Sequence, residues 1–311
     1  MSDRQSQFNH FLKTFPQPLR SALQSIPQNS GRLDARRCTA AMETAAMSTE
    51  DLMVALLPAA SLYARVPISN FKVGAVVKAR LSENEDEFSL LLGANLEFAE
   101  QSLSQTIHAE QTAVVNAWQQ GAVQIDAIAV SAAPCGRCRQ FLYELDTRHA
   151  LTVMIQDPDE NSYTAEQLPG LLPLAFGGQD LSVKDGWMTM RGDLPKLNLK
   201  TLSDDPHVQG ALAAAAQTYA PYTHNLAGCA IEVDNQKIYT GAYVENAAFN
   251  PSLSPLHSAL IGMNMDELVT AGKISRAILA EKPTSINQQG VCRLLLESVA
   301  PDIELEYYEI R

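Results

Sequence analysis

The feature that most constrains the fold is a set of matching landmarks in the two halves of this 311-residue chain. Each half has a proline seven residues before a glycine, followed by two short stretches of similar pattern in the same order. The pairs are Pro67–Gly74 and Pro221–Gly228, VGAVV (73–77) and AGCAI (227–231), and LGANLEF (92–98) and TGAYVEN (240–246). Because shared order over several landmarks is typical of an internal repeat, the sequence predicts a duplicated domain.

The first copy alternates between strand and helix patterns. In order, the stretches read as strand, strand, helix, strand, helix and strand: FKVGAVVKAR (71–80), FSLLLGANLEF (88–98), HAEQTAVVNAWQQG (108–121), IDAIAVSA (125–132), CGRCRQFLYEL (135–145) and LTVMI (151–155). Apolar runs that alternate in this way pack as a sheet covered by helices. The sequence therefore predicts a small α/β layer.

The segments around this copy have other patterns. Near the start, apolar residues recur at spacings of mostly three and four and are interrupted by prolines, which predicts one or two amphipathic helices. Ser48, with Asp51 three residues later, predicts the N-cap of a helix over 49–64. We expect a helical N-terminal segment (1–50), a first domain (51–155), an extended linker or arm rich in proline and glycine (156–206), and a second domain (207–311).

Two cysteines three residues apart, in SAAPCGRCRQF (131–141), admit three interpretations. A redox dithiol requires a thioredoxin-like context, and a structural zinc site requires four ligands. A catalytic zinc requires three protein ligands and an open position for water. Upstream, HAEQTA supplies His108 and Glu110, so the chain spells H-x-E, 23 residues, then P-C-x-x-C, the zinc-deaminase signature. We therefore interpret Cys135 and Cys138 as ligands of a catalytic zinc, together with His108.

This ligand set implies hydrolytic chemistry. Bound zinc can lower the pKa of water from 15.7 to about 7 and supply hydroxide at neutral pH. Glu110 is not needed as a ligand, so it is free to take the proton of that water and pass it to the substrate. Attack of hydroxide on an amidine carbon, with loss of ammonia, is hydrolytic deamination. Since residues i and i+2 diverge by about 200° on a regular helix, His108 and Glu110 both reach the metal only if a helix begins there.

Composition limits the class of partner. The chain carries 23 Lys and Arg against 35 Asp and Glu, a formal net charge of −12, which disfavours a nucleic acid but not an uncharged nucleoside. A nucleic-acid or transfer-RNA deaminase, the alternative enzyme, needs a basic groove, yet residues 51–155 hold 7 basic against 11 acidic residues. A zinc-stabilised structural protein, the non-enzymatic alternative, has no need of Glu110.

The cellular compartment is predicted from cysteines and apolar segments. Five cysteines in a chain of this length do not indicate a disulfide framework, and the first residues lack the pattern of a secretory signal. The longest apolar stretch, residues 52–64, is too short to span a bilayer. We therefore expect a cytoplasmic protein without a membrane partner.

Six stretches of the chain resemble the cytidine deaminase family, specifically its long, dimeric bacterial type with a degenerate second core domain. They are NFKVGAVV, GANLEF, TIHAEQTAVVNAW, PCGRCRQFLYEL, LPLAFGGQDL and ENAAFNP. The resemblance implies an α/β fold of two tandem deaminase-like domains, each a mixed sheet flanked by helices, after a small helical segment. It also implies one zinc ion per chain and deamination of cytidine and deoxycytidine to uridine and deoxyuridine in pyrimidine salvage.

The resemblance implies roles for five residues of the first domain. It implies that Asn95 and Glu97 hydrogen-bond the ribose 3′-hydroxyl and that Phe71 lines the pyrimidine pocket. It implies that backbone groups at Ala109 and Ala133 contact the base and the departing amine.

The resemblance also implies that Phe176, in LPLAFGGQDL, reaches the pyrimidine pocket of the neighbouring subunit in a homodimer. Arg139, beside a zinc-ligand cysteine, resembles a family arginine that tempers the charge of the thiolates. Both implications concern how the site is completed rather than which residues hold the metal.

The second copy departs from the site pattern. No P-C-x-x-C follows its glycine landmark, and His257 falls one residue out of register, which indicates a structural histidine. Aligning the copies on their glycines pairs Gly241 with Gly93, Tyr243 with Asn95, Leu256 with His108, and Ser258 with Glu110. We therefore expect the second domain to be a zinc-free copy that serves assembly.

Overall fold

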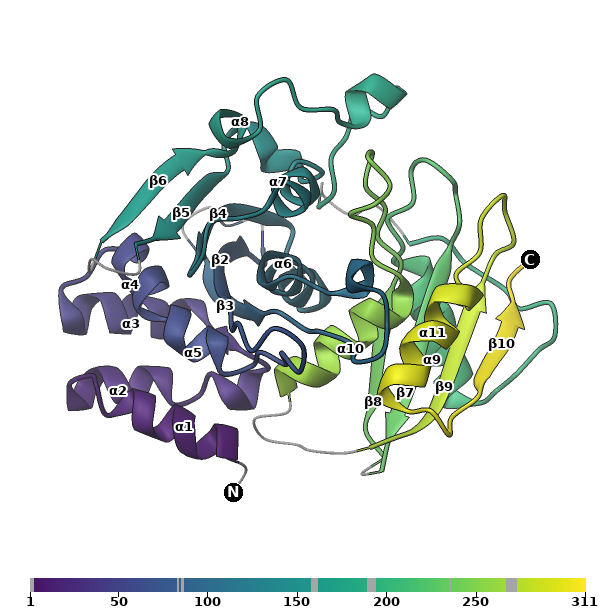
Figure 1. The fold of residues 1–311 in the computed structure, drawn as a ribbon, viewed down its shortest axis with the longest axis horizontal. Coiled ribbons are helices and arrows are strands. Elements are labelled where there is room, and N and C mark those ends of the chain that lie inside the picture. The colour runs from purple at the N-terminus through teal and green to yellow at the C-terminus, as the bar shows by residue number, and fades with distance from the viewer. Residues whose placement is uncertain are drawn as a thin grey trace.

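Two β-sheets and a central pair of helices organise the part of the chain that the structure describes. The computed structural model describes residues 3–82, 84, 87–157, 162–188, 194–234, 236–266 and 273–311. The central helices, α6 (Ala109–Gln119) and α10 (Pro255–Asp266), pack against each other between the two sheets (Figure 1). None of the described helices is long and apolar enough to cross a membrane.

The N-terminal segment is helical, as predicted. It forms α1 (Asp3–Leu12), α2 (Gln17–Leu23), a short 3-10 turn and α3 (Ala35–Ala45). Pro16 and Pro18 lie at the start of α2, where a missing N–H leaves no hydrogen bond unmade. The apolar stripe is turned toward the first domain and buries Phe8, Leu12, Leu19, Leu23 and Ile26.

The helix predicted over 49–64 begins where expected but is broken into two. The amide of Asp51 donates to Ser48 Oγ at 3.0 Å, which caps α4 (Thr49–Ala55). A second helix, α5 (Leu57–Ser61), follows with Pro58 in its first turn. Proline has no N–H to continue the ladder of helical hydrogen bonds, so the ladder restarts at this point.

The first sheet is mixed and has six strands: β1 (Arg32–Leu33), β2 (Gly74–Arg80), β3 (Ser89–Ala94), β4 (Gln124–Val130), β5 (Thr152–Gln156) and β6 (Tyr163–Gln167). Their order is β1-β3-β2-β4-β5-β6; β2 is antiparallel to β3 and β4, and β4 is parallel to β5. Helices α4 and α5 cover one face, whereas α6 and α7 (Gly136–Leu142) cover the other (Figure 1). The predicted strands and helices of the first copy are all present.

The second sheet repeats the core of the first. Its strands, β7 (Ala227–Val233), β8 (Ile238–Ala242), β9 (Ile274–Glu281) and β10 (Leu305–Glu309), lie beside α9 (Pro206–Ala216) and α11 (Gln289–Val299). The order β10-β9-β7-β8 matches β5-β4-β2-β3, with the same parallel and antiparallel pairs. Even an irregularity of pairing recurs, after Lys78 in β2 and after Glu232 in β7. The structure therefore confirms two tandem α/β domains of one architecture.

The segment 156–206, predicted as an extended linker, is partly a component of the first domain. Strand β6 adds an antiparallel edge to β5. Farther along, Trp187 is buried against Trp118 and Phe141. A mostly exposed edge strand without apolar alternation gives little signal in the sequence, so the predicted end of the first domain at residue 155 leaves out β6.

Candidate metal centre and adjoining cavity

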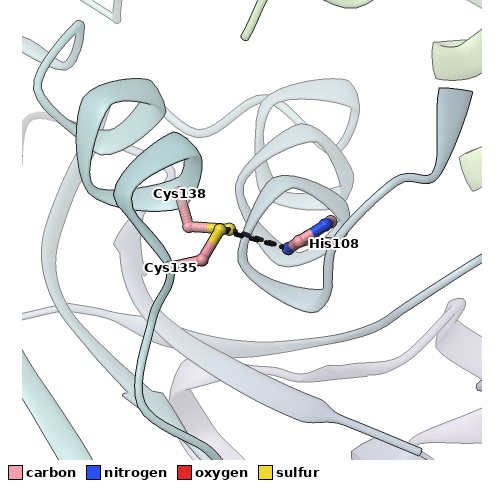
Figure 2. A group of neighbouring side chains, drawn as sticks. All are labelled: His108, Cys135 and Cys138. Atoms are coloured by element: carbon pink, nitrogen blue, oxygen red, sulfur yellow. Dashed lines mark hydrogen bonds between the residues drawn. The ribbon is translucent and has the colours of Figure 1, made fainter. Parts of the chain in front are cut away.

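Three side chains from two helix starts converge at one point of the first domain (Figure 2). His108 Nδ1 lies 3.3 Å from Cys138 Sγ and 3.6 Å from Cys135 Sγ, and the two sulfur atoms are 3.6 Å apart. The structure thus brings together the three residues that the sequence predicts as zinc ligands.

The spacing of these atoms fits zinc. A tetrahedral ion with Zn–S bonds of ~2.3 Å and a Zn–N bond of ~2.0–2.1 Å places its sulfur ligands ~3.8 Å apart and sulfur and nitrogen ~3.6 Å apart. The observed separations of 3.3–3.6 Å are close to these values. Two thiolates and one imidazole leave the fourth tetrahedral position for water, which is the pattern of a catalytic rather than a structural site.

The starts of two helices explain how residues close in sequence reach the same point. His108 is the N-cap of α6, with extended backbone angles of φ −85° and ψ 161°. Glu110 already lies in the first turn of that helix. The helix therefore begins where the H-x-E spacing requires it. Likewise, Cys135 is the N-cap of α7, and Cys138 lies one turn along the same helix.

The two thiols differ in their readiness to ionise before a metal binds. Hydrogen bonding to Cys138 and to His108 lowers the pKa of Cys135 to about 3. The hydrogen bond with Cys135, followed by burial, raises the pKa of Cys138. Cys135 is therefore the first thiolate, and the second forms against its charge. A divalent cation removes that penalty because it neutralises both.

Glu110 lies beside this centre and is 4% exposed. Burial is the largest cause that raises the pKa of its carboxyl group, and hydrogen bonding and the nearby His108 act against it. A carboxyl group with a raised pKa in a partly dry site can accept and donate a proton near neutral pH.

A cavity of about 280 Å³ opens next to these residues. It brings together the metal-binding His108 and Cys135, the acid Glu110 and all five residues predicted to bind substrate in the first domain. The remaining walls come from small side chains. The lining residues are Ser69, Phe71, Val73, Asn95, Glu97, Thr106, His108, Ala109, Glu110, Ala132, Ala133 and Cys135.

Asn95 and Glu97 hold the loop that forms one wall of the cavity. Asn95 Nδ2 donates to the carbonyl of Phe71 at 2.9 Å, and Asn95 Oδ1 accepts from the amide of Val73 at 2.9 Å. The carboxylate of Glu97 accepts from the hydroxyl and amide of Ser69. Although partial burial opposes ionisation, hydrogen bonds from this loop lower the pKa of Glu97. The ring of Phe71 remains 62% exposed at the mouth.

Comparisons with known proteins agree with this centre. The family description "Cytidine and deoxycytidylate deaminase zinc-binding region" matches the chain twice, over residues 47–154 and over residues 168–293. A cytidine deaminase of Aliivibrio fischeri is 36% identical over 309 residues, 99% of each chain. That of Photobacterium profundum is 39% identical over 300 residues, 95% of this chain and 96% of its own.

The chain belongs to the cytidine deaminase family. It is accordingly an enzyme, a zinc-dependent hydrolase, with one deaminase-type zinc centre in its described part. Among solved structures, the cytidine deaminase of Mycobacterium tuberculosis is 29% identical, with a TM-score of 0.33, over 41% of this chain and 96% of its own.

The described residues of the second deaminase-like domain hold no such metal cluster, and the register of this domain differs from the prediction by two residues. The loop between bridged residues Val244 and Leu253 is two residues shorter than that between Leu96 and Ile107. This shortening moves the helix start, so Leu256 does not correspond to His108. The observed correspondences are Ser254 with His108, Leu256 with Glu110, and His257 with Gln111. Ser254 thus replaces the metal ligand and Leu256 replaces the acid, so both functional side chains are missing from these positions.

Two arginines of α7, Arg137 and Arg139, make different contacts near the metal centre. The guanidinium of Arg139 donates to the carbonyls of Pro134 and Leu171, both at 2.9 Å, and so ties the start of α7 to the segment after β6. Burial lowers the pKa of Arg137, and the charges of the two cysteines oppose that effect. The influence of Arg139 on the charge of the thiolates stays a prediction.

Phe176 lies outside the cavity of its own chain. Its side chain is 45% exposed, and it is not among the described residues that line the cavity. Gln140 Nε2, on α7, donates to the backbone carbonyl of Phe176 at 2.8 Å. The backbone at Phe176 is thus held by the same helix that carries the two cysteines.

Sequence reasoning missed one buried residue of the helix start, Gln111. Its Oε1 accepts from the amide of His108 at 3.1 Å, and its Nε2 donates to the carbonyl of Pro251 at 3.1 Å. A glutamine three residues after an N-cap is the signal of a capping box, and HAEQ contains it. Four wall residues of the cavity, Ser69, Val73, Thr106 and Ala132, have no signal in the sequence.

Proposed function

We propose that the protein hydrolyses cytidine and deoxycytidine to uridine and deoxyuridine with release of ammonia, at a zinc ion held by His108, Cys135 and Cys138. The observation that carries this proposal is the buried Glu110 next to the three ligands, in the wall of a cavity of about 280 Å³. Relatives over nearly the whole length, from Aliivibrio fischeri and Photobacterium profundum, are named cytidine deaminases.

The catalytic role falls to Glu110. When bound, zinc supplies hydroxide at neutral pH by lowering the pKa of a water molecule to about 7. Glu110 takes the proton that this water loses and later delivers a proton to the departing amine, which leaves as ammonia. Its raised pKa suits both halves of this transfer, because the carboxyl group must be a base first and an acid afterwards.

The substrate lies between the metal centre and the loop that Asn95 and Glu97 hold. The ionised carboxylate of Glu97 and the amide of Asn95 line the cavity and can bond a sugar hydroxyl. Backbone groups of Ala109 and Ala133 face the base, and the exposed ring of Phe71 covers it.

The site is completed by a second copy of the chain. Phe71 leaves the cavity open at its mouth, and Phe176 presents an aromatic ring to solvent outside its own cavity. In a homodimer, Phe176 of the neighbouring subunit fills that mouth. The exposure of both aromatic side chains supports this arrangement.

Pyrimidine salvage by this enzyme takes place in the cytoplasm. All five cysteines are unpaired, which supports a reducing compartment.

The deciding experiment measures uridine and ammonia formed from cytidine and from deoxycytidine by zinc-loaded protein. The matched control is His108→Ala, which we expect to lose zinc and turnover together. Protein that binds one zinc per chain but forms no uridine from either nucleoside would contradict the proposal and favour one of the two alternatives, a nucleic-acid deaminase or a zinc-stabilised structural protein.

A further inference from the structure

The two central helices make a reciprocal pair of contacts across the domain boundary. In each helix, a side chain three residues after the N-cap accepts from the N-cap amide and also reaches a carbonyl in the loop before the other helix. For α6 these atoms are Gln111 Oε1 with His108 N (3.1 Å) and Gln111 Nε2 with Pro251 O (3.1 Å). For α10 they are His257 Nδ1 with Ser254 N (3.2 Å) and His257 Nε2 with Gln105 O (3.2 Å).

His257 is suited to this double contact. It is 4% exposed, and its ring packs edge-on against Phe98 of the first domain, with centroids 5.9 Å apart. Burial, followed by the charge of Arg137, lowers the pKa of its imidazole to about 3. The ring is therefore neutral at neutral pH, with one nitrogen as donor and the other as acceptor. Nδ1 accepts from the amide of Ser254 and lies 2.9 Å from the hydroxyl oxygen of the same residue, which leaves the Nε2 proton for the carbonyl of Gln105.

The contact lies directly before a zinc ligand. The 3-10 turn Leu103–Gln105 leads through Ile107, which pairs with Leu96, to His108. Two consecutive carbonyls of this turn accept hydrogen bonds from other elements. The carbonyl of Ser104 accepts from Arg137 Nη1 at 2.8 Å, and the carbonyl of Gln105 accepts from His257 Nε2. The first donor, Arg137, belongs to α7, the helix that carries the cysteines. The second donor, His257, belongs to α10 of the second domain, whose described residues hold no metal cluster.

We propose that His257 is a positioning residue for the zinc centre, and that the zinc-free domain acts on the metal through it. The inference rests on the proposed role of His108 as a ligand. With the Gln105 carbonyl fixed, the backbone at His108 has one position, and its imidazole is held ready for the ion. Without this bond, the turn before His108 gains freedom that must be lost again when the metal binds, so the affinity for zinc falls.

The test compares zinc binding in His257 variants. His257→Leu removes the imidazole's hydrogen bonds to Ser254 and to Gln105, and His257→Asn keeps a polar group in the buried position but is too short to reach Gln105. His257→Gln places at this position the side chain that makes the same two contacts at residue 111. Zinc dissociation constants are measured by competition with a chromogenic chelator, and the absorption spectrum of the Co²⁺-substituted protein reports the ligand geometry.

We expect the zinc dissociation constant to rise about tenfold in His257→Leu and His257→Asn, at the low end of the effect of outer-shell partners, and to recover in His257→Gln. The absorption spectrum of the Co²⁺-substituted protein should change in the same two variants, His257→Leu and His257→Asn. The matched control is Asn225→Ala, which removes buried hydrogen bonds to Glu281 and Lys282 within the second domain only.

Equal zinc affinity in wild-type protein and in His257→Asn would overturn the proposal, as would weakened binding in Asn225→Ala to the same degree. A glutamine variant as weak as the leucine variant would also overturn it, because the two hydrogen bonds would then not be the cause. Loss of zinc in His108→Ala tests the ligand itself. If that variant retained zinc, the proposed function would fail independently of His257.

Discussion

Glu110 shows, at the scale of one residue, how burial serves chemistry. A carboxyl group that is 4% exposed is costly to ionise, and this same cost raises its pKa toward the range in which it can both take and return a proton. The three ligand side chains beside it bind the metal and do not need the raised pKa of Glu110. Binding of the metal and transfer of the proton should therefore be separable by substitution.

We predict that Glu110→Gln keeps one zinc per chain but loses about 10²- to 10⁴-fold in turnover, since only the proton transfer is removed. Zinc content by atomic absorption and the rate of uridine formation from cytidine check this. His108→Ala is the control that should lose the metal. Substantial activity in Glu110→Gln would show that another group carries the proton.

Asn95 and Glu97 lead to a prediction about the substrate. Their polar atoms line the cavity, and a site built to bond a hydroxyl rejects an analogue without it, because the hydrogen bonds to that hydroxyl are lost. We expect 3′-deoxycytidine to react far more slowly than cytidine, whereas loss of the 2′-hydroxyl should matter much less. Comparable kcat/KM values for cytidine and its 3′-deoxy analogue would remove both residues from ribose recognition.

At the scale of the elements, a close approach between a strand and a helix fixes the start of each central helix. A Cβ atom on Gly93 would lie 2.2 Å from the amide nitrogen of Ala113 in α6, and a Cβ atom on Gly241 would lie 2.2 Å from that of Ala259 in α10. Only glycine allows β3 and β8 to approach these helices so closely. The register of the strand thereby sets where His108 lies.

We predict that Gly93→Ala and Gly241→Ala each lower the free energy of unfolding by about 3 kcal/mol, the upper part of the range for overpacking, because the obstructing atoms belong to the backbone. Gly290→Ala is the control, since nothing lies within 4 Å of its added Cβ atom in α11, and it should stabilise by about 0.4–1 kcal/mol. Urea unfolding of the zinc-loaded proteins gives all three values. Unchanged stability in Gly93→Ala would mean that α6 can shift away from β3.

At the scale of the whole molecule, the proposed dimer makes each site depend on two chains. If Phe176 acts in the neighbouring subunit, a dimer of one Glu110→Ala chain and one Phe176→Ala chain has one site with both defects and one intact site. Random exchange makes half of the dimers mixed, so about a quarter of all sites should recover. Cytidine turnover after verified subunit exchange measures this. Activity equal to the sum of the two parents would place Phe176 in its own chain's site or in neither.

The sequence by itself predicted the chemistry of the centre and determined the outline of the fold. The ligands His108, Cys135 and Cys138 and the acid Glu110 follow from residue type and spacing, because a metal accepts few donors and a helix start can bring them together in few ways. The strands and helices of the first domain follow from local apolar patterns, and the duplication follows from landmarks that two copies share.

Only the tertiary structure decided how the two copies meet. The edge strand β6, the contact of Arg139 with Leu171 and the reach of His257 to Gln105 all depend on residues distant in sequence. Local propensity carries no information on such contacts, because the same residue is satisfied by solvent, by its own helix or by another domain. Which partner it meets is settled by packing, after the local elements have formed.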